Sequence, residues 1–363
     1  MSQEQWHVVS MAVQSNTPII LWGEPGIGKS RRIEQLAKSL GYDIETVIAS
    51  IREPSDFCGL PVVQEGGTVK FAPPDFAHRL MEGRKSILFL DEISTAPAAV
   101  QAALMRVVLD RTIGDFVLPK DVAVIAAANP AETTAGCWDL SAPLANRFAH
   151  VNIDIQIGEW TKWAEGNPID IVGSKVPESW QEYKESALVL FSVFLKSNSG
   201  LLHKLPKDSK NSSRAWPSPR SWEMASIMLA ACRSTLMADM HPISVECIKS
   251  CVGEGAMTEF LAWRRDLDLP DPTELLQHPK KWKIPKRSDI ILLTLNSLAI
   301  HVIEDGSILK WEQAWDVLDR IIENKQPDLA AMAGRKLARR KPEGAKNPKC
   351  AVKLFELLEA AEK

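Results

Sequence analysis

Residues 23–30 read GEPGIGKS and directly follow the apolar run PIILW. Glycines let the backbone N–H groups of such a loop turn inward around phosphate oxygens, and a helix starting at the loop adds its positive N-terminal end. In this pattern the lysine reaches the β- and γ-phosphates and the serine hydroxyl binds Mg²⁺. The pattern therefore predicts a site for the phosphates of a nucleotide. Its residues are Gly23, Glu24, Pro25, Gly26, Ile27, Gly28, Lys29 and Ser30.

Two carboxylates end a second apolar run, ILFLDE, at residues 87–92. We expect Asp91 to hold Mg²⁺, directly or through water, and Glu92 to orient and polarise the attacking water. An apolar run before Asp-Glu is by itself a common strand end. Downstream of a phosphate-binding loop, the same residues predict hydrolysis of the nucleotide rather than binding alone.

Asn129 ends a third apolar run, VIAAANP. A side-chain amide at the end of a strand beside the phosphates can hold the lytic water against the γ-phosphate. Asparagine before proline is also an ordinary turn starter. The functional interpretation of Asn129 therefore depends on the two motifs that precede it.

These side chains require a parallel sheet, because the carboxyl ends of parallel strands meet at one edge, where ligands bind. Short β-rich runs do alternate with helical patterns over the first part of the chain. Turn residues at Gly66-Gly67 and the segment RTIGDFVLPKD each indicate an inserted hairpin. The expected strands are 18–22, 43–50, 86–90, 122–128 and 150–155, and the expected helices are 29–40 and 96–110.

The pattern becomes mainly helical after residue 157. A polar loop, KLPKDSKNSSR, interrupts it, and the proline-rich segment LDLPDPTELLQHP marks a further boundary. We therefore predict three domains. They are an α/β nucleotide-binding core with inserted hairpins (1–157), a helical lid (158–265) and a helical C-terminal extension without recognisable chemistry (266–363).

Five short segments together resemble the AAA+ ATPases, and specifically their MoxR-like branch: GEPGIGKS, ILFLDE, AAANP, ANRF and SPR. The two inserted hairpins are similar to that branch as well. The resemblance covers about residues 1–260. It implies an α/β P-loop AAA+ core, with a parallel sheet and helices on both faces, followed by an all-α lid domain; the helical extension lies beyond it.

The resemblance also implies roles for two arginines. Arg147, in LANRF, matches the arginine finger, which reaches the nucleotide of the neighbouring subunit and neutralises charge on the transferred phosphoryl group. Arg220, in WPSPRSWE, matches the second sensor, a lid arginine that reports the γ-phosphate from within the same chain. The alternative interpretations are a surface arginine at 147 and, at 220, a helix-start arginine paired with Glu223.

The function implied by the resemblance is Mg²⁺-dependent hydrolysis of ATP in a ring, most simply a hexamer. The hydrolysis would be coupled, as in a chaperone or activator, to remodelling of a client protein or of a partner with a von Willebrand A domain. The Gly66-Gly67 hairpin is the candidate for contact with the client. No base-reading motif separates ATP from GTP, and the resemblance favours ATP.

A basic segment supports a second hypothesis, a nucleic-acid-associated or defence-system AAA+ motor. The formal net charge of −3 and the lack of interleaved aromatic residues argue against it. A solvated helix face explains the same segment. A nucleotide switch without hydrolysis is disfavoured, since every residue named above for hydrolysis is present. The cations are Arg335, Lys336, Arg339, Arg340, Lys341, Lys346 and Lys349.

The remaining sequence features predict a cytoplasmic protein that does not enter a membrane. The N-terminal residues lack the basic start and apolar core of a signal peptide. The apolar run 290–303 is too short to span a bilayer and contains polar residues. Among the six cysteines, Cys247 and Cys251 have the spacing of one helix face rather than of a metal site, so we expect reduced core thiols.

Overall fold

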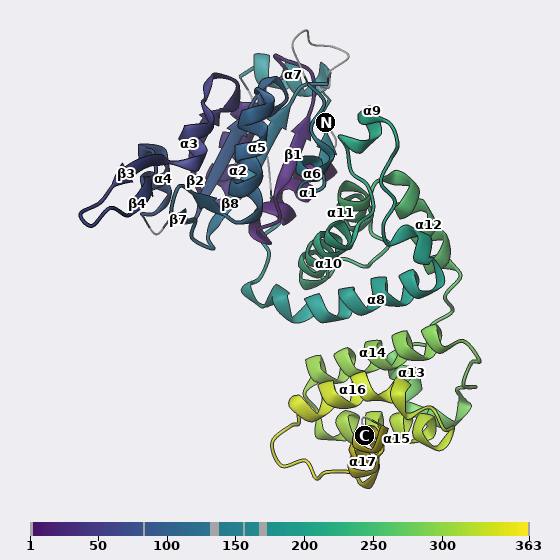
Figure 1. The fold of residues 1–363 in the computed structure, drawn as a ribbon. Coiled ribbons are helices and arrows are strands. Elements are labelled where there is room, and N and C mark those ends of the chain that lie inside the picture. Colours follow the sequence, from purple (N-terminus) through teal and green to yellow (C-terminus); the bar gives the residue numbers. More distant parts are fainter. Residues whose placement is uncertain (1–2, 83, 131–137, 155–156, 167–172, 362–363) are drawn as a thin grey trace. The chain divides into compact units, whose positions relative to one another are not determined.

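The computed structural model describes residues 3–82, 84–130, 138–154, 157–166 and 173–361, which we call the described residues. The chain forms two compact units (Figure 1), the first made of residues 1–187 and 198–259 and the second of residues 188–197 and 260–363. The three-domain division at 157/158 and 265/266 is drawn from composition rather than from packing, and it stays a prediction.

A five-stranded parallel sheet with the strand order β2-β5-β8-β1-β9 forms the centre of the first unit. The three middle strands are buried along almost their whole length, which is why they are continuous apolar runs in the sequence. The predicted α/β core with a parallel sheet is confirmed. The strands are β1 (Ile19–Trp22), β2 (Asp43–Ile48), β5 (Ser86–Asp91), β8 (Val122–Ala128) and β9 (Ala149–Asn152).

All five predicted strands are present, and the differences lie at their ends. β2 stops at Ile48 rather than at residue 50, because the 3₁₀ turn η1 (Ala49–Ile51) follows it. β9 stops at Asn152 rather than at residue 155, which lies outside the described residues. The turn η1 places a serine beside the predicted catalytic glutamate, as described below.

Helix α2 (Lys29–Leu40) has the predicted bounds and begins directly after the glycine-rich loop. Glycines in the left-handed conformation flank it, Gly28 with φ 82° and Gly41 with φ 75°, a backbone region that glycine enters without a Cβ clash. Helix α5 (Ala98–Leu109) begins two residues later than predicted. Further helices of this unit are α1 (Gln3–Gln14), α3 (Pro54–Cys58), α4 (Asp75–Leu80), α6 (Ala142–Ala145), α7 (Ile157–Ala164), α9 (Ser209–Ser212), α10 (Pro219–Ser234) and α11 (Pro242–Val252).

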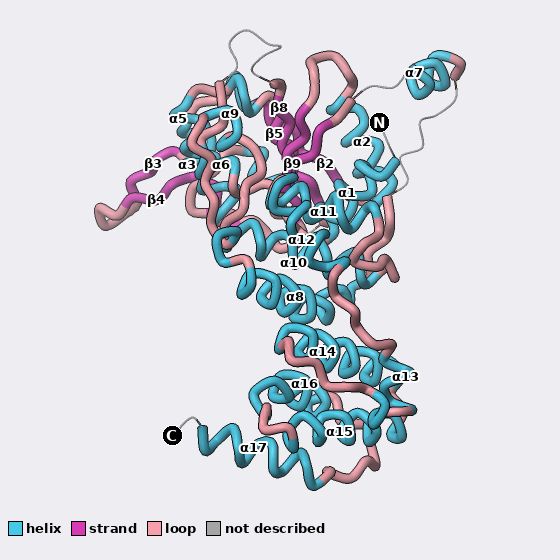
Figure 2. The backbone as a smooth tube through the Cα atoms, turned by 90° about the vertical axis from the view of Figure 1, so that its right-hand side faces the viewer, coloured by secondary structure: helices cyan, strands magenta, loops and turns pink. Residues whose placement is uncertain are grey.

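Both predicted hairpins are present and are joined to each other. The Gly114 N–H donates to the Phe57 carbonyl at 3.1 Å, and the Asp115 N–H donates to the Phe71 carbonyl at 3.1 Å. A Cβ on Gly114 would lie 2.6 Å from the Phe71 carbonyl oxygen, so the close approach requires glycine. The first hairpin extends away from the sheet (Figures 1 and 2). The hairpins are β3 (Leu60–Val63) with β4 (Val69–Ala72), and β6 (Thr112–Ile113) with β7 (Phe116–Val117).

Helix α10 is attached to the sheet through its N-terminal cap. The Ser218 hydroxyl accepts from the Ser221 N–H at 3.1 Å and donates to Oδ1 of Asn146 at 2.6 Å. The Asn146 amide in turn donates to the Trp216 carbonyl at 3.1 Å. Asn146 belongs to the ANRF segment between α6 and β9, so this segment and the start of α10 are fixed to each other.

The second unit is helical and has its own core around Trp311 and Trp315, whose ring centroids lie 5.8 Å apart. The Trp311 indole N–H donates to the Leu337 carbonyl at 2.9 Å. No helix among the described residues is long and apolar enough to cross a membrane. The helices are α13 (Pro272–Gln277), α14 (Ser288–Asp305), α15 (Ile308–Glu323), α16 (Pro327–Arg339) and α17 (Lys349–Ala361). The residues of α8 (Lys184–Ser197) and of α12 (Glu254–Arg265) are divided between the first and the second unit.

Candidate nucleotide-binding site

Lys29 lies in the first turn of α2, and its side chain turns back onto the loop before it. Its ammonium Nζ donates to the Gly23 carbonyl at 2.7 Å, to the Glu24 carbonyl at 3.0 Å and to Oδ1 of Asn129 at 2.7 Å. The residue is 8% exposed. An ammonium has three donors, and a bound phosphate would compete for them with these oxygens.

The three glycines of the loop serve two purposes. Gly26 and Gly28 both have φ 82° and open space around the place of a Cβ, so their requirement is conformational. Gly23 is needed for packing, since a Cβ there would lie 2.6 Å from both the Ile153 carbonyl oxygen and the Ile27 side chain. The backbone of the loop at Gly23 therefore packs closely against the carbonyl of Ile153, just after β9, and against the side chain of Ile27.

Ser30 and Asp91 meet beside the loop, with the Ser30 hydroxyl donating to the Asp91 carboxylate at 2.8 Å. Mg²⁺ prefers oxygen ligands in octahedral geometry at about 2.0–2.1 Å, which puts neighbouring ligands about 2.9 Å apart. A hydroxyl and a carboxylate oxygen at 2.8 Å fit two adjacent positions of such an ion. The predicted role of these two residues as Mg²⁺ ligands is compatible with this separation and stays a prediction.

Glu92 follows β5 with a left-handed backbone, φ 56°. Its N–H donates to Oδ1 of Asp91 at 2.9 Å, and its carboxylate accepts from the Ser50 hydroxyl at 2.6 Å. Sequence reasoning did not single out Ser50. Because this serine holds the carboxylate of the predicted base, it controls how freely Glu92 can turn toward a water molecule.

Asn129 is fixed at the end of β8 by its backbone N–H, which donates to the buried Ser94 hydroxyl at 3.0 Å. Its side-chain oxygen lies 2.7 Å from Nζ of Lys29. The carboxyl ends of β1, β5 and β8 thus deliver a lysine, a hydroxyl, a carboxylate and an amide to one edge of the sheet. The structure brings together Lys29, Ser30, Asp91 and Asn129.

Arg147 and Arg220 lie near each other within one chain. Burial and, secondly, the charge of Arg220 lower the pKa of the Arg147 guanidinium. Arg147 donates from Nη1 to the Pro143 carbonyl, while its Nε is buried without a hydrogen-bond partner. Glu223, the alternative partner considered for Arg220, accepts from Lys184 at 3.3 Å. The charge of Asp110 opposes this lowering of the Arg147 pKa.

Comparison with known proteins finds a family match for one part of the chain. Residues 18–148 match the model of the AAA domain of the dynein-related subfamily. The matched segment spans β1 to the ANRF motif and contains Lys29, Ser30, Asp91 and Asn129. These residues form an AAA domain, and over them the chain resembles the MoxR-like AAA+ ATPases.

Individual relatives are distant. The chain is 28% identical to the chaperone MoxR1 of Mycobacterium tuberculosis over 135 residues, which are 36% of this chain and 34% of MoxR1. It is 25% identical to midasin of Giardia intestinalis over 167 residues, which are 44% of this chain and 3% of midasin. The chain therefore spans about a third of one relative and a small part of the other. A candidate ATPase of known structure from Cytophaga hutchinsonii is 19% identical, with a TM-score of 0.38, over 69% of this chain and 77% of that one.

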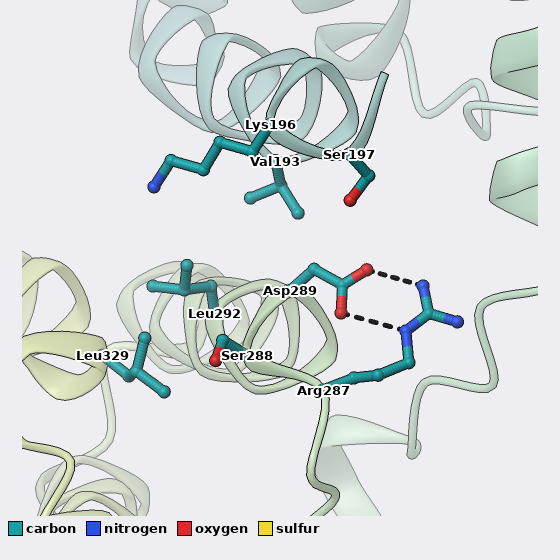
Figure 3. A pocket seen from close by; sticks show the side chains of 8 residues that line it. All are labelled: Val193, Lys196, Ser197, Arg287, Ser288, Asp289, Leu292 and Leu329. Atoms are coloured by element: carbon teal, nitrogen blue, oxygen red, sulfur yellow. Dashed lines mark hydrogen bonds and ion pairs between the residues drawn. The ribbon is translucent and has the colours of Figure 1, made fainter. Parts of the chain in front are cut away.

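A pocket in the second unit lies apart from these motifs in sequence (Figure 3) and has a volume of about 470 Å³. Its charged residues include Arg287 and Asp289, which bind each other at 2.6 Å. The wall is completed by Lys196 and Ser197 from α8 and by Leu329 from α16. Because Arg287 and Asp289 neutralise each other, their charges give the pocket no preference for a charged ligand.

The other side chains considered from the sequence are in the basic segment around α16 and among the cysteines. In the basic segment, Lys336 donates to Asn296 at 2.7 Å, whereas Arg339 and Lys341 are exposed. Cys247 and Cys251 lie on α11, buried together with Cys232, and burial raises the pKa of Cys251 to about 12. Among the described residues, no group of three or more His, Cys, Asp or Glu is placed to hold a metal ion.

Proposed function

We propose that the chain hydrolyses ATP with Mg²⁺ in a ring and uses the hydrolysis to remodel or activate a partner protein. The observation that carries the proposal is the hydrogen-bonded cluster of Lys29, Asn129, Ser30 and Asp91, with Glu92 next to it. Mg²⁺ supplies charge neutralisation on the phosphate oxygens. Lys29 binds the β- and γ-phosphates, Glu92 polarises the attacking water, and Asn129 orients it.

The arginine pair supports a site shared between neighbouring chains. Arg147 and Arg220 repel each other, and burial leaves Nε of Arg147 unpartnered, so an anion between them would relieve both costs. Because Asn146 and Ser218 fix the two segments to each other, the arginines move as one body. We therefore propose that both arginines act on the phosphate of the neighbouring chain; the prediction from the sequence, that Arg220 reads the nucleotide of its own chain, is the alternative.

The exposed hairpin supports a protein client. Five apolar side chains of β3 and β4 are exposed: Leu60 by 61%, Val62 by 42%, Val63 by 73%, Val69 by 49% and Phe71 by 41%. Exposed apolar side chains gathered on one element are typical of surfaces that bind protein. The hairpin that extends from the nucleotide-binding unit (Figure 2) is therefore the candidate for client contact, with a von Willebrand A domain protein as the expected partner.

Phosphate release from ATP at increasing protein concentration tests the proposal. The wild-type rate per chain should rise with concentration, because the sites are completed by neighbours. Lys29→Ala should abolish release at every concentration, and Arg147→Ala and Arg220→Ala should each abolish the rise. Arg84→Ala is the matched control, since this arginine is exposed and pairs with Asp43.

A rate per chain that stays constant with dilution, and that Arg147→Ala leaves unchanged, would refute the shared site. Release without added Mg²⁺ at the full rate would refute the metal dependence. If Arg220→Ala lowered nucleotide affinity in dilute, unassembled protein, the second arginine would serve its own chain after all.

A further inference from the structure

Trp22, the last residue of β1, stands directly before the phosphate-binding loop and is linked to the arginine segment through His150. The Trp22 indole N–H donates to Nδ1 of His150 at 2.9 Å, and Nε2 of His150 lies 2.9 Å from the Ala145 carbonyl oxygen. Because Nδ1 accepts a hydrogen bond from the indole N–H, Nε2 must carry the ring proton and donate a hydrogen bond to the Ala145 carbonyl. Ala145 is the last residue of α6, two positions before Arg147.

The hydrogen bonds of His150 to Trp22 and Ala145 require a neutral imidazole. The Trp22 and His150 rings are stacked, with centroids 6.1 Å apart and planes inclined by 11°. Burial, more than the nearby charge of Arg214, lowers the pKa of His150 to about 4, although its hydrogen bond to Ala145 opposes the shift. At neutral pH the ring therefore keeps one donor and one acceptor, which is what the two neighbours require.

The second arginine segment reaches the same tryptophan. The Arg214 guanidinium lies 3.6 Å from the centre of the Trp22 ring, and its Nη1 donates to Oδ1 of Asn152 at 3.4 Å. Arg214 lies in the loop that leads through Ser218 into α10 and Arg220. The segment that carries Arg147 is thus linked to Trp22 through His150, and the segment that carries Arg220 is linked to it through Arg214. Trp22 directly precedes the phosphate-binding loop.

We infer that His150 is a positioning residue, which holds the Arg147 segment against the end of β1 and so sets where the arginine pair stands for the neighbouring chain. The inference rests on the proposed shared site. It assigns to the histidine a role that it exerts through the Ala145 carbonyl and the Trp22 indole. A shift of about 1 Å in a group that acts on the transferred phosphate can cost on the order of 100-fold in rate.

The test uses assemblies of two different chains to separate two roles. The acceptor chain holds the ATP that is hydrolysed, and the donor chain supplies its arginines to that ATP. A Glu92→Gln chain holds nucleotide and donates arginines but does not hydrolyse; an Arg147→Ala chain hydrolyses only if a neighbour supplies the arginine. Neither is active alone, and their mixture should release phosphate. His150→Phe, which keeps an aromatic ring but neither hydrogen bond, is then placed in one partner at a time.

In the donor chain, His150→Phe should lower the rate of the mixture at least tenfold, with the KM for ATP unchanged. In the acceptor chain the same substitution should change the rate less than twofold. His150→Gln, whose side-chain amide can replace the Nε2 donor to Ala145, should restore most of the loss in the donor. Thermal unfolding of each chain checks that the variants are folded.

Three results would overturn the inference. Equal losses in donor and acceptor would mean that His150 serves general stability. A loss confined to the acceptor would mean that it serves the phosphate-binding loop through Trp22. An unmodified mixture without activity would refute the shared site itself, and the inference would fall with it, whereas an active mixture insensitive to His150 would refute the inference alone.

Discussion

Protonation of His150 should make the first unit sensitive to acid. Burial holds the pKa of this imidazole at about 4 in the folded protein, against 6.5 for an exposed histidine. The unfolded chain therefore binds a proton that the folded chain rejects. The contribution of His150 to the free energy of unfolding is therefore complete above pH 6.5. It falls as the pH drops toward 4 and changes no further below that value.

The size of the effect follows from the shift. Each pKa unit corresponds to about 1.36 kcal/mol, so the free energy of unfolding should fall by roughly 3 kcal/mol across this window because of His150 alone. Carboxylates titrate at lower pH and add their own dependence. His150→Phe removes the group and leaves those carboxylates in place, so the difference between wild type and variant isolates the histidine.

Two measurements check this prediction. Proton resonances of the imidazole rings, with that of His150 assigned by its absence from the His150→Phe variant, should show that His150 titrates near pH 4. Hydrogen exchange of peptides from β1 and β9 in urea should give an unfolding free energy that depends on pH more steeply in wild type than in the variant. A His150 midpoint near 6.5, or parallel pH dependences of the two proteins, would refute the reasoning.

Three further substitutions test other contacts. Ser50→Ala removes an exposed hydrogen bond to the Glu92 carboxylate worth about 0.5–1.5 kcal/mol, so basal phosphate release should rise roughly two- to tenfold, and a fall would contradict this. Asp239→Ala removes the carboxylate from the Arg233 guanidinium, which is 18% exposed and keeps its hydrogen bond to the Ser186 hydroxyl, and should lower stability by about 1.5–3 kcal/mol in thermal unfolding. Gly114→Ala should loosen the joined hairpins, so that limited proteolysis cuts them faster; unchanged cleavage would count against the required close approach.

The part of the site that could be predicted from the sequence depends on local chemistry. Lys29 and Ser30 belong to a contiguous loop, and Asp91 and Asn129 each end an apolar run. Parallel strands bring such run ends to one edge, so the cluster follows from strand positions alone. The strands themselves were predictable because the buried middle strands are continuous apolar runs.

The residues that sequence reasoning missed act across long separations. Ser50 reaches Glu92 over 42 residues, and His150 reaches Trp22 over 128. A serine near a strand end and a histidine within a strand carry no signal of their own. The grouping of Arg220 with Arg147 likewise depends on the hydrogen bond between Ser218 and Asn146, 72 residues apart, and no local pattern encodes that bond.

The hydrogen bonds of Lys29 indicate how nucleotide binding could prepare the site for hydrolysis. Its ammonium donates to two loop carbonyls and to Oδ1 of Asn129. Phosphate oxygens carry more charge than these acceptors and form stronger bonds with an ammonium, so we expect them to displace at least the amide. Asn129, held by its backbone N–H at Ser94, would then keep its place while its side chain became available to water. When a phosphate oxygen replaces the Asn129 amide as the hydrogen-bond acceptor of Lys29, the same step would bind the phosphate and release the amide to position the water.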